Sequence, residues 1–240
     1  MHPRFFCPEL PDAGQDCPLP EAVAHHAERV LRLRVGEPIV LFDGEGAEAQ
    51  AEIVRLGRDP LARIQSRAQV DREAPLVITL VQALATGDKM DWIVQKAVEL
   101  GVSRVVPVAA ERSVLRLEGE RAAKRVAHWQ QIAVSASEQS GRNRILHVAP
   151  LIGLPQWLAT ARGTLCWMLE PEAGERLSRR SRPADAVSLL VGPEGGWSER
   201  ELAAARGAGC EPVALGPRVL RTETAGLAAM AAMMALWGDY

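Results

Sequence analysis

The spacing of apolar residues changes near residue 73, and this change predicts two regions with different folds. Before it, short apolar runs alternate with polar residues, as they do in half-buried β-strands. The clearest case is "EPIVLFDGEGAEAQAEIVRL", where an apolar run meets the turn signal Asp43-Gly44 and alternation follows. This pattern predicts a β-hairpin. A helix that begins near Pro20 and ends just before Gly36 is expected to interrupt the strands. We therefore expect a small β-rich domain over residues 1–73.

From residue 74 onward, buried apolar strands alternate with amphipathic helices, which predicts an α/β fold with a parallel sheet covered on both faces. Asp88 is expected to cap one helix, which ends at Gly101, and a long helix runs from about Glu118 to Gln139. Helical sequence is expected after each of the three later strands. The segment "RLSRRSRPAD" is expected to be a mobile surface loop. The predicted strands cover 76–85, 102–110, 164–170, 186–194 and 211–216.

Composition narrows the classes of function. The chain has 240 residues, of which 48% are hydrophobic, and a formal net charge of −2. This charge excludes a globally basic nucleic-acid binder and leaves room for local basic patches. The four cysteines lack metal-like spacing and predict reduced thiols. The N-terminus has no apolar signal-peptide region, and the longest uncharged apolar run, 225–237, is shorter than the roughly 20 residues that span a membrane. We therefore expect a cytoplasmic protein without metal or membrane contact.

A glycine-rich loop after a predicted strand indicates a ligand site. The sequence "LLVGPEGGWSERE" runs from the strand into the loop that begins at Gly192. Ser198 stands three residues before Glu201, which is the pattern of a capping box at the start of a helix. Three glycines and a proline exceed what a tight turn needs. Such glycines let backbone amides approach a ligand closely at the carboxyl end of a parallel strand.

A second loop, "LGPRVLRTETAG" at 215–226, joins a strand to the final helix in the same way. Thr222 is predicted to cap this helix, so structure alone accounts for one threonine. Folding does not account for Arg218 and Arg221, because a helix N-terminus favours anions over cations. Guanidinium groups beside a glycine loop suit a phosphate or a developing oxyanion. We therefore predict a functional role for both arginines.

The sequence "GEGAEA" at 44–49 fits the loose fingerprint of a dinucleotide-binding loop. That loop requires a helix directly after the glycines. Strand-like alternation follows here instead. We therefore reject a nicotinamide-dependent enzyme built on this segment.

Taken together, the motifs resemble the RsmE family, which are SPOUT-class methyltransferases that modify N3 of a uridine in 16S ribosomal RNA. The resemblance rests on "VGPEGGWSERE" and "LGPRVLRTETA" as a pair, with "GDKMDWIVQKAVELGV", "ERS" at 111–113 and "EQSGR" at 138–142 before them. It covers nearly the whole chain, since "RFF", "HHAERVLRLRVGE" and "DGEG" are similar to the family's PUA-like β-barrel. The chain departs from the family at Ala85-Thr86, where members often have Pro-Lys.

The resemblance implies a PUA-like RNA-binding domain over 1–73 and a SPOUT domain with a C-terminal trefoil knot over 74–240. It also implies a homodimer that uses S-adenosyl-L-methionine and acts on 16S rRNA of the small ribosomal subunit. Arg221 or Arg218 would stabilise charge that develops on the uridine, and Glu138 or Glu223 would take its proton. The cofactor loops would comprise Leu169, Glu170, Pro171, Gly192, Pro193, Glu194, Gly195, Gly196, Leu215, Gly216, Leu220, Arg221, Thr222 and Thr224. RNA contacts would come from Arg4, Arg29, Arg32, Arg34, Arg112 and Arg142.

Two other functions stay open at this point. A non-catalytic RNA-binding or ribosome-assembly protein would carry an idle cofactor pocket, and the intact glycine loops count against it. A SPOUT enzyme that acts on another RNA, such as transfer RNA, would share the cofactor motifs, and the paired domains favour ribosomal RNA. The sequence identifies neither the modified nucleotide nor whether free rRNA or an assembled subunit is the substrate.

Overall fold

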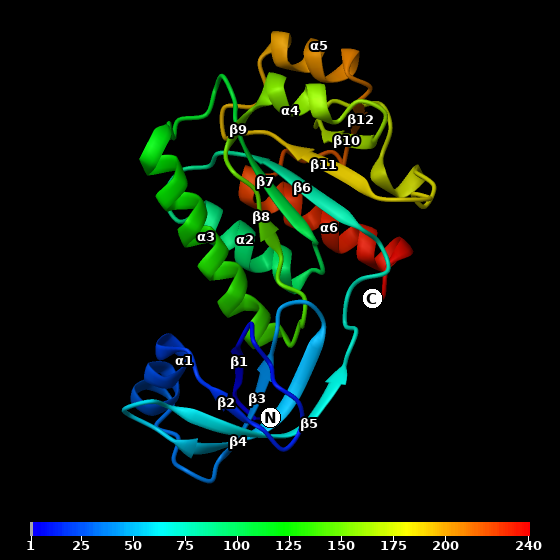
Figure 1. The fold of residues 1–240 in the computed structure, drawn as a ribbon. Helices are drawn as coiled ribbons and strands as arrows, with labels where there is room; N and C mark the ends of the chain where they lie inside the picture. Colours follow the sequence, from blue (N-terminus) through cyan, green and yellow to red (C-terminus); the bar gives the residue numbers. More distant parts are fainter. Residues whose placement is uncertain (1) are drawn as a thin grey trace. The chain divides into compact units, whose positions relative to one another are not determined.

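A computed structural model describes residues 2–240, and the chain forms two compact units (Figure 1). Unit 1 comprises Met1–Glu73 together with Ser137–Ile145, and unit 2 comprises Ala74–Ala136 together with Leu146–Tyr240. The first boundary falls after residue 73. The short segment 137–145, which the sequence assigns to the second region, belongs to unit 1.

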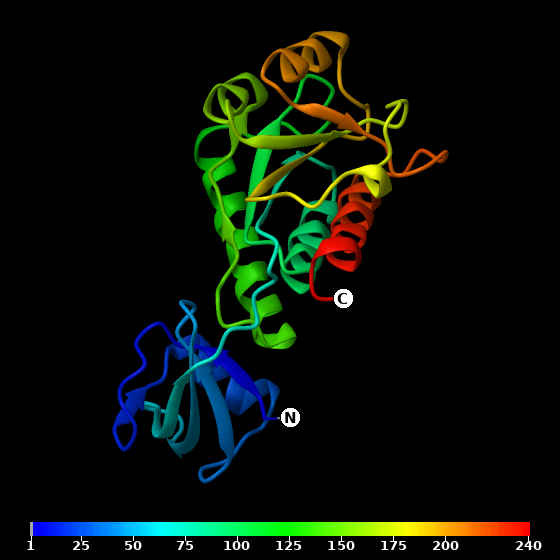
Figure 2. The ribbon, with the colours of Figure 1, turned by 90° about the vertical axis from the view of Figure 1, so that its right-hand side faces the viewer.

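Unit 1 is built on a five-stranded sheet with the strand order β1-β3-β4-β5-β2. β1 and β3 are parallel, and the other neighbours are antiparallel. The sheet is curled, as Figure 2 shows, and this curvature fits the small barrel that the resemblance implies. Its interior contains fully buried side chains such as Phe5, Ile39 and Ile64. The strands are β1 (Arg4–Phe6), β2 (Asp16–Pro18), β3 (Pro38–Phe42), β4 (Ala47–Arg55) and β5 (Leu61–Gln69).

The predicted hairpin is confirmed by β3 and β4, which pair antiparallel on either side of the turn at Asp43. Oδ1 of Asp43 accepts the backbone N–H groups of Glu45, Gly46 and Ala47 at 2.8, 3.0 and 2.9 Å. An aspartate side chain that satisfies neighbouring amides in this way stabilises a turn. Because strand β4 and not a helix follows, "GEGAEA" lacks the context of a dinucleotide-binding loop.

The prediction that the first helix reaches the residue before Gly36 is wrong. α1 spans Glu21–His25 and continues as one π-helical segment, η1, over His26–Val30. Arg32 then has a φ of +56°, which lies in the left-handed region and ends a right-handed helix. The N–H of Leu33 donates to the carbonyl of Ala27 at 2.9 Å and closes the helix at this point.

Unit 2 contains a parallel sheet, which confirms the predicted α/β fold. The strand order is β12-β10-β11-β6-β7-β8, and β9 pairs with β7 outside this path. Every pair in the sheet is parallel. The strands are β6 (Ile78–Ala83), β7 (Arg104–Ala109), β8 (His147–Val148), β9 (Ile152–Gly153), β10 (Leu165–Leu169), β11 (Val187–Val191) and β12 (Glu211–Val213).

Helices cover both faces of this sheet, as Figure 1 shows. Successive strand residues point to opposite faces, so Leu80 enters one apolar core and Val81 enters the other. The first core includes Trp129 of α3 and side chains of α2 and α6, and the second includes Trp157 of α4 and a side chain of α5. The helices are α2 (Lys89–Glu99), α3 (Gly119–Ser140), α4 (Leu154–Thr160), α5 (Glu199–Gly207) and α6 (Thr222–Trp237). Across residues 2–240, none of the helices combines the length and apolar character that a membrane crossing requires.

The expectation of a helix after β10 is wrong. In the described chain only a short 3-10 segment, η2 (Leu177–Arg179), lies between β10 and β11. The expected mobile loop is also anchored over its first half. Leu177 is buried and its N–H donates to the carbonyl of Ala214 at 2.9 Å. Arg180 forms ion pairs with Glu175 and Glu211.

Residues 137–145 complete unit 1 through polar contacts with its first strand. Glu138 Oε1 accepts the backbone N–H of Phe6 at 3.0 Å. Asn143 Oδ1 accepts from the guanidinium of Arg4 at 2.6 Å. Gly44 lies against Ile145, so that a methyl group on Gly44 would meet that side chain at 3.0 Å. Without residues 137–145 the N–H of Phe6 would lose the acceptor that Glu138 supplies, and Arg4 would keep only Glu48 as a hydrogen-bond partner.

Candidate functional site

A cavity of about 740 Å³ lies in unit 2 at the carboxyl ends of β10, β11 and β12. These three strands are neighbours in the sheet, so the loops that follow them meet although they are distant in sequence. The volume falls within the roughly 300–1,000 Å³ of small-molecule sites. Strand ends in parallel sheets are where such sites form.

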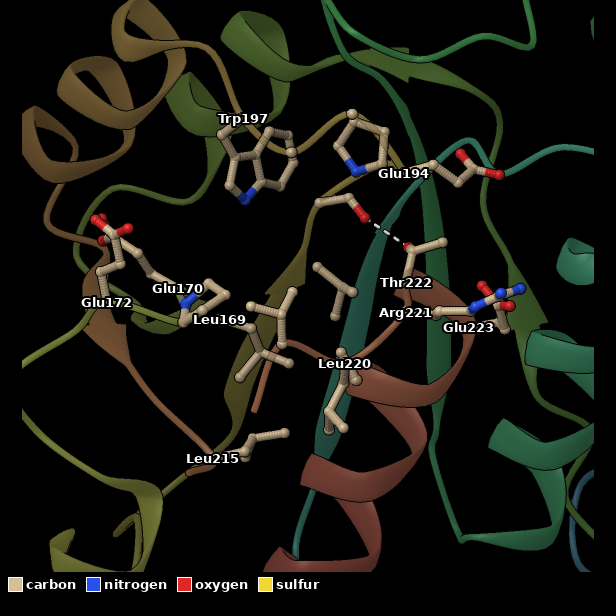
Figure 3. A pocket seen from close by; sticks show the side chains of 18 of the residues that line it. Leu169, Glu170, Glu172, Glu194, Trp197, Leu215, Leu220, Arg221, Thr222 and Glu223 are labelled. Atoms are coloured by element: carbon tan, nitrogen blue, oxygen red, sulfur yellow. Dashed lines mark hydrogen bonds between the residues drawn. The ribbon is translucent and has the colours of Figure 1, made fainter. Parts of the chain in front are cut away.

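Apolar side chains lie in the middle of the cavity in Figure 3, with charged side chains on both sides of them. Leu169, Leu215 and Leu220 form this apolar part. Glu170 and Glu172 lie beside Leu169, and Glu194, Arg221 and Glu223 lie on the opposite side. The structure therefore brings together nearly all the predicted cofactor-binding residues. Those that line the cavity are Leu169, Glu170, Pro171, Gly192, Pro193, Glu194, Gly195, Gly196, Leu215, Gly216, Leu220, Arg221 and Thr222.

Thr222 connects the two glycine loops. Its hydroxyl donates to the carbonyl of Gly192 at 2.5 Å and accepts from Nε2 of Gln82 at 2.9 Å (Figure 3). Gln82 and Thr222 are buried, and Gly192 is half-buried. The prediction that Thr222 caps α6 is wrong, because Arg221 occupies the N-cap position and no side chain caps this helix. The hydroxyl instead fixes the distance between the loops after β11 and β12.

Glu194 is held at the rim by three hydrogen bonds. Its Oε1 accepts from the N–H of Thr86 at 2.9 Å, from the hydroxyl of Thr86 at 2.8 Å and from Nζ of Lys89 at 2.9 Å. Burial alone would raise the pKa of Glu194, but these hydrogen bonds outweigh it and lower the pKa to about 2. Hydrogen bonding to Glu194 in turn raises the pKa of Lys89. Both side chains therefore stay charged at neutral pH.

The glycine loop after β11 packs too tightly for larger residues at two positions. A Cβ on Gly192 would lie 3.1 Å from Nε1 of Trp197, and one on Gly195 would lie 3.1 Å from the carbonyl oxygen of Arg112. Arg112 also donates to the carbonyls of Gly195 and Trp197 at 3.4 and 3.2 Å. These contacts explain why the loop needs glycine at both places.

The predicted capping box at the start of α5 is confirmed. Ser198 Oγ accepts the N–H of Glu201 at 3.1 Å, and Glu201 Oε2 accepts the N–H of Ser198 at 2.9 Å. The other oxygen of Glu201 accepts the N–H of Glu111 at 2.8 Å. A single buried carboxylate thus joins the start of α5 to the loop after β7.

Arg218 and Arg221 both line the cavity and both are exposed. Within residues 2–240 neither guanidinium makes a hydrogen bond or an ion pair. Val219 between them is 79% exposed, which is unusual for an apolar residue in a loop beside a cavity. The loop therefore presents two free cations and an apolar side chain to whatever occupies the site.

Two predicted site residues lie elsewhere. Thr224 is exposed on α6 and does not line the cavity. Glu138 belongs to unit 1, where it binds the amide of Phe6, and burial raises the pKa of its carboxyl. Glu138 does not line the cavity within this chain.

The predicted RNA-contacting arginines divide into three groups. Arg112 lies on unit 2, where it donates to the carbonyls of Gly195 and Trp197. Arg29, Arg32 and Arg34 are exposed on unit 1. Arg4 and Arg142 are instead engaged inside unit 1, Arg4 with Glu48 at 2.8 Å and Arg142 with Glu73. The side chain of Arg4 is only 7% exposed, which leaves little of it for a phosphate.

Three residues that the sequence patterns left out of the site line or support it. Lys89 and Trp197 line the cavity, and Gln82 binds Thr222 beneath it. Lys89 looked like an ordinary residue of an amphipathic helix. Only its position in the fold could have indicated a role. Lys89 follows β6, and the carboxyl end of β6 lies beside that of β11 in the sheet.

Comparison with known proteins decides the family. An RNA methyltransferase domain model matches residues 72–234, and an RNA methyltransferase PUA domain model matches residues 19–64. A curated relative from Mycobacterium bovis, ribosomal RNA small subunit methyltransferase E, is 36% identical over 236 residues, which cover 95% of this chain and 90% of the relative. The chain belongs to the RsmE family. The resemblance carried by the paired loop motifs is therefore confirmed.

Solved structures of similar proteins agree with the RsmE fold over the full chain. A crystal structure of ribosomal RNA small subunit methyltransferase E from Neisseria gonorrhoeae bound to S-adenosyl methionine is 45% identical, with a TM-score of 0.95, and the match covers 100% of this chain and 99% of that one. A Legionella pneumophila structure in complex with the bound cofactor SAM is 36% identical, with a TM-score of 0.96 and full coverage of both chains.

Proposed function

We propose that this protein is an S-adenosylmethionine-dependent methyltransferase that modifies N3 of a uridine in 16S ribosomal RNA. The observation that carries the proposal is the cavity at the ends of β10, β11 and β12, which is lined by every predicted cofactor-binding residue except Thr224. Membership of the RsmE family and the ligand named for the Neisseria gonorrhoeae structure support it. The protein would act in the cytoplasm, as a homodimer, on the small ribosomal subunit.

The residues present fit the methyl donor. S-adenosylmethionine joins a flat adenine and a ribose to a charged amino-acid tail through a sulfonium, which supplies an activated methyl group. The apolar part formed by Leu169, Leu215 and Leu220 suits the adenine ring. The glycine loop offers backbone groups, and the carboxylates of Glu170 and Glu194 suit hydroxyl and ammonium groups.

The chain itself must stabilise charge on the acceptor. When N3 of uridine loses its proton, negative charge spreads onto the two flanking carbonyl oxygens. A fixed guanidinium at such an oxygen lowers the barrier as an oxyanion hole does. Arg221 is the first candidate because it lines the cavity at the start of α6 without a partner of its own in the described chain. Arg218, three residues earlier on the same loop, is the second.

The test is single-turnover methyl transfer by Arg221→Ala at saturating donor. Small ribosomal subunits from cells that lack the gene serve as acceptor, and tritiated methyl is the readout. We expect the rate to fall by about 100- to 1,000-fold. Arg200→Ala is a matched control, since Arg200 is 83% exposed on α5 and pairs with Glu111 outside the cavity. A wild-type rate together with wild-type donor affinity in Arg221→Ala would rule out this role.

Two measurements separate the remaining alternatives. Calorimetry with S-adenosylmethionine distinguishes a working site from an idle pocket in a non-catalytic assembly protein. Mapping the tritiated methyl on RNA distinguishes a ribosomal substrate from another RNA and locates the nucleotide.

A solution mass of twice 26.0 kDa would support the homodimer. The trefoil knot and the bounds 1–73 of the PUA-like domain remain proposals that rest on the family.

A further inference from the structure

The proposed reaction needs a proton acceptor that no observation so far has assigned. At neutral pH N3 of uridine carries a proton, and the nitrogen becomes a good nucleophile only as that proton leaves. A positioned base contributes typically 100- to 10,000-fold to such a step. Carboxylates are the available bases at this cavity, because no histidine lines it among the described residues.

Four glutamates line the cavity, and three are unsuited to the role. Both oxygens of Glu170 accept from Arg206 at 2.8 Å. Glu194 is occupied by Thr86 and Lys89, and its low pKa makes it a poor base. Glu172 is exposed to solvent on the loop after β10, at the end of the cavity away from α6 (Figure 3).

Glu223 differs from these three. Its side chain is 19% exposed, and its Oε2 is buried with no hydrogen-bond partner in the described chain. A buried carboxylate oxygen without a donor is costly in a folded protein and marks a group that a ligand completes. Glu223 lies two residues after Arg221 at the start of α6, and Figure 3 shows both side chains on the same side of the site.

The charged groups that face Glu223 come from three elements. Nζ of Lys89, on α2, lies 3.7 Å from Oε2 of Glu223. Glu194, on the loop after β11, holds Lys89 from its other side, and Arg221 precedes Glu223 on α6. The cavity therefore holds an acceptor carboxylate close to two cationic donors, Lys89 at 3.7 Å and Arg221 two residues before it on the chain. The N3 edge of uracil offers the complementary groups, an N–H donor and two carbonyl acceptors.

The geometry points to Glu223 as the base that takes the N3 proton, with Lys89 and Arg221 facing the two flanking carbonyl oxygens. In this step the N3–H bond breaks and the proton passes to the Glu223 carboxylate. The electron pair left on N3 forms the bond to the methyl carbon as the carbon–sulfur bond breaks. Sulfur keeps the electron pair of the broken carbon–sulfur bond and leaves as a neutral thioether. The proton then leaves to solvent. This assignment rests on the proposed function and goes beyond it by identifying the base and the edge of the nucleotide that is recognised.

The test is the pH dependence of single-turnover methyl transfer by Glu223→Gln at saturating donor. We expect a loss of about 100-fold at pH 7, and a rate that then rises about tenfold per pH unit because only the small ionised fraction of uridine reacts. The wild-type rate should rise less steeply. Subunits reconstituted with 16S RNA that contains 5-fluorouridine, whose N3 is more acidic, should rescue Glu223→Gln more than they accelerate the wild type.

Glu172→Gln is the matched control, because it removes another carboxylate from the same cavity. Its pH profile should run parallel to that of the wild type. If Glu223→Gln folds poorly, Glu223→Asp keeps the carboxylate one methylene further back and should lose rate while keeping the wild-type pH slope. A Glu223→Gln deficit that is constant over pH and insensitive to fluorination would overturn the assignment. Absence of methyl transfer by the wild type would instead overturn the proposed function.

Discussion

A single hydroxyl sets the spacing of the cofactor loops. Thr222 binds Gly192 on one side and Gln82 on the other, so three segments of unit 2 meet at one side chain. Gln82 belongs to β6, Gly192 follows β11, and Thr222 begins α6. Removing the hydroxyl would leave Nε2 of Gln82 with only the carbonyl of Ala83 as partner and would take the Thr222 donor from the carbonyl of Gly192, which costs more than the bonds themselves contribute.

Thr222→Val should therefore weaken both the fold and donor binding. We expect unit 2 to lose about 1–3 kcal/mol of its free energy of unfolding. Donor affinity should fall about tenfold, because the loops no longer hold a fixed separation. Urea denaturation followed by tryptophan fluorescence and calorimetry with S-adenosylmethionine measure the two effects. Thr222→Ser retains the hydroxyl and should stay close to the wild type in both. Equal affinity of the valine and serine variants would show that the hydroxyl does not control the loops.

The sequence predicted the site residues whose role depends on local backbone conformation. It did not predict the residues whose role depends on a contact with a distant part of the chain. The glycines after β11 predict a close approach of backbone to ligand, which stays a prediction, and the structure adds that a Cβ on Gly192 or Gly195 would press on Trp197 or Arg112. The role of Thr222 was missed because its partner Gln82 is 140 residues away. Lys89 was missed for the same reason, since its partner Glu194 is 105 residues away.

Elements show the same division between local and distant causes. The hairpin at Asp43 and the capping box at Ser198 depend on residues a few positions apart, and both were predicted correctly. The end of η1 was not predicted, because the left-handed Arg32 has no sequence signature such as glycine. In place of the helix expected after β10, the segment around Arg176 pairs with Ala214, the residue directly after β12. No local sequence pattern predicts that contact.

Glu48 on β4 holds the elements of unit 1 together and should give this unit a specific acid sensitivity. It binds Arg72 at 2.7 Å, Arg4 at 2.8 Å and Asn143 at 3.2 Å. Hydrogen bonds from Arg72 and Arg4 lower the pKa of Glu48 to about 2, from an ordinary value of 4.5. A lowered pKa stabilises the fold above pH 4.5, and this stabilisation is lost as the pH falls from there toward 2.

Glu48→Gln should accordingly destabilise unit 1 by about 3 kcal/mol at pH 7, because a buried ion pair loses one partner. The difference between wild type and variant should shrink below pH 4.5, because the unfolded wild type then binds a proton that the folded protein, in which the pKa of Glu48 is about 2, does not. Unit 1 has no tryptophan, so amide hydrogen exchange of β3 and β4, read by mass spectrometry, is the appropriate measurement. Glu52→Gln is the control, because Glu52 lies on β4 like Glu48 and its carboxylate makes only an exposed hydrogen bond, which it accepts from Gln65 of β5. A difference that persists unchanged at pH 3 would contradict the electrostatic explanation.

At the scale of the whole molecule, the cavity and the exposed arginine surface lie in different units. The cavity belongs entirely to unit 2, whereas the exposed arginines at 29, 32 and 34 belong to unit 1. Val30, Leu31 and Val35 are exposed beside them, so this surface combines cations with apolar side chains. RNA offers phosphates and, in its unpaired regions, base faces that match such a surface.

Charge reversal at Arg32 and Arg34 should weaken binding of the small ribosomal subunit and flatten its salt dependence. Each phosphate contact that is lost should reduce the slope of log affinity against log salt by about one. Donor affinity should not change, because neither residue lines the cavity. The matched control is charge reversal at Arg55 and Arg58, two other exposed arginines of unit 1. The same slope in both double variants would mean that residues 32 and 34 do not contact RNA.

The polar contacts of residues 137–145 bear on how this protein can be dissected. Phe6 and Arg4 find their partners in a stretch of chain that is translated more than a hundred residues after them. A gene fragment that stops at codon 73 therefore encodes unit 1 without the partners that Glu138 and Asn143 supply to β1, although the ion pair between Arg4 and Glu48 remains. During synthesis the ribosome must likewise extrude all of α3 before these contacts can form. To produce unit 1 by itself, residues 137–145 would have to be joined to residues 1–73.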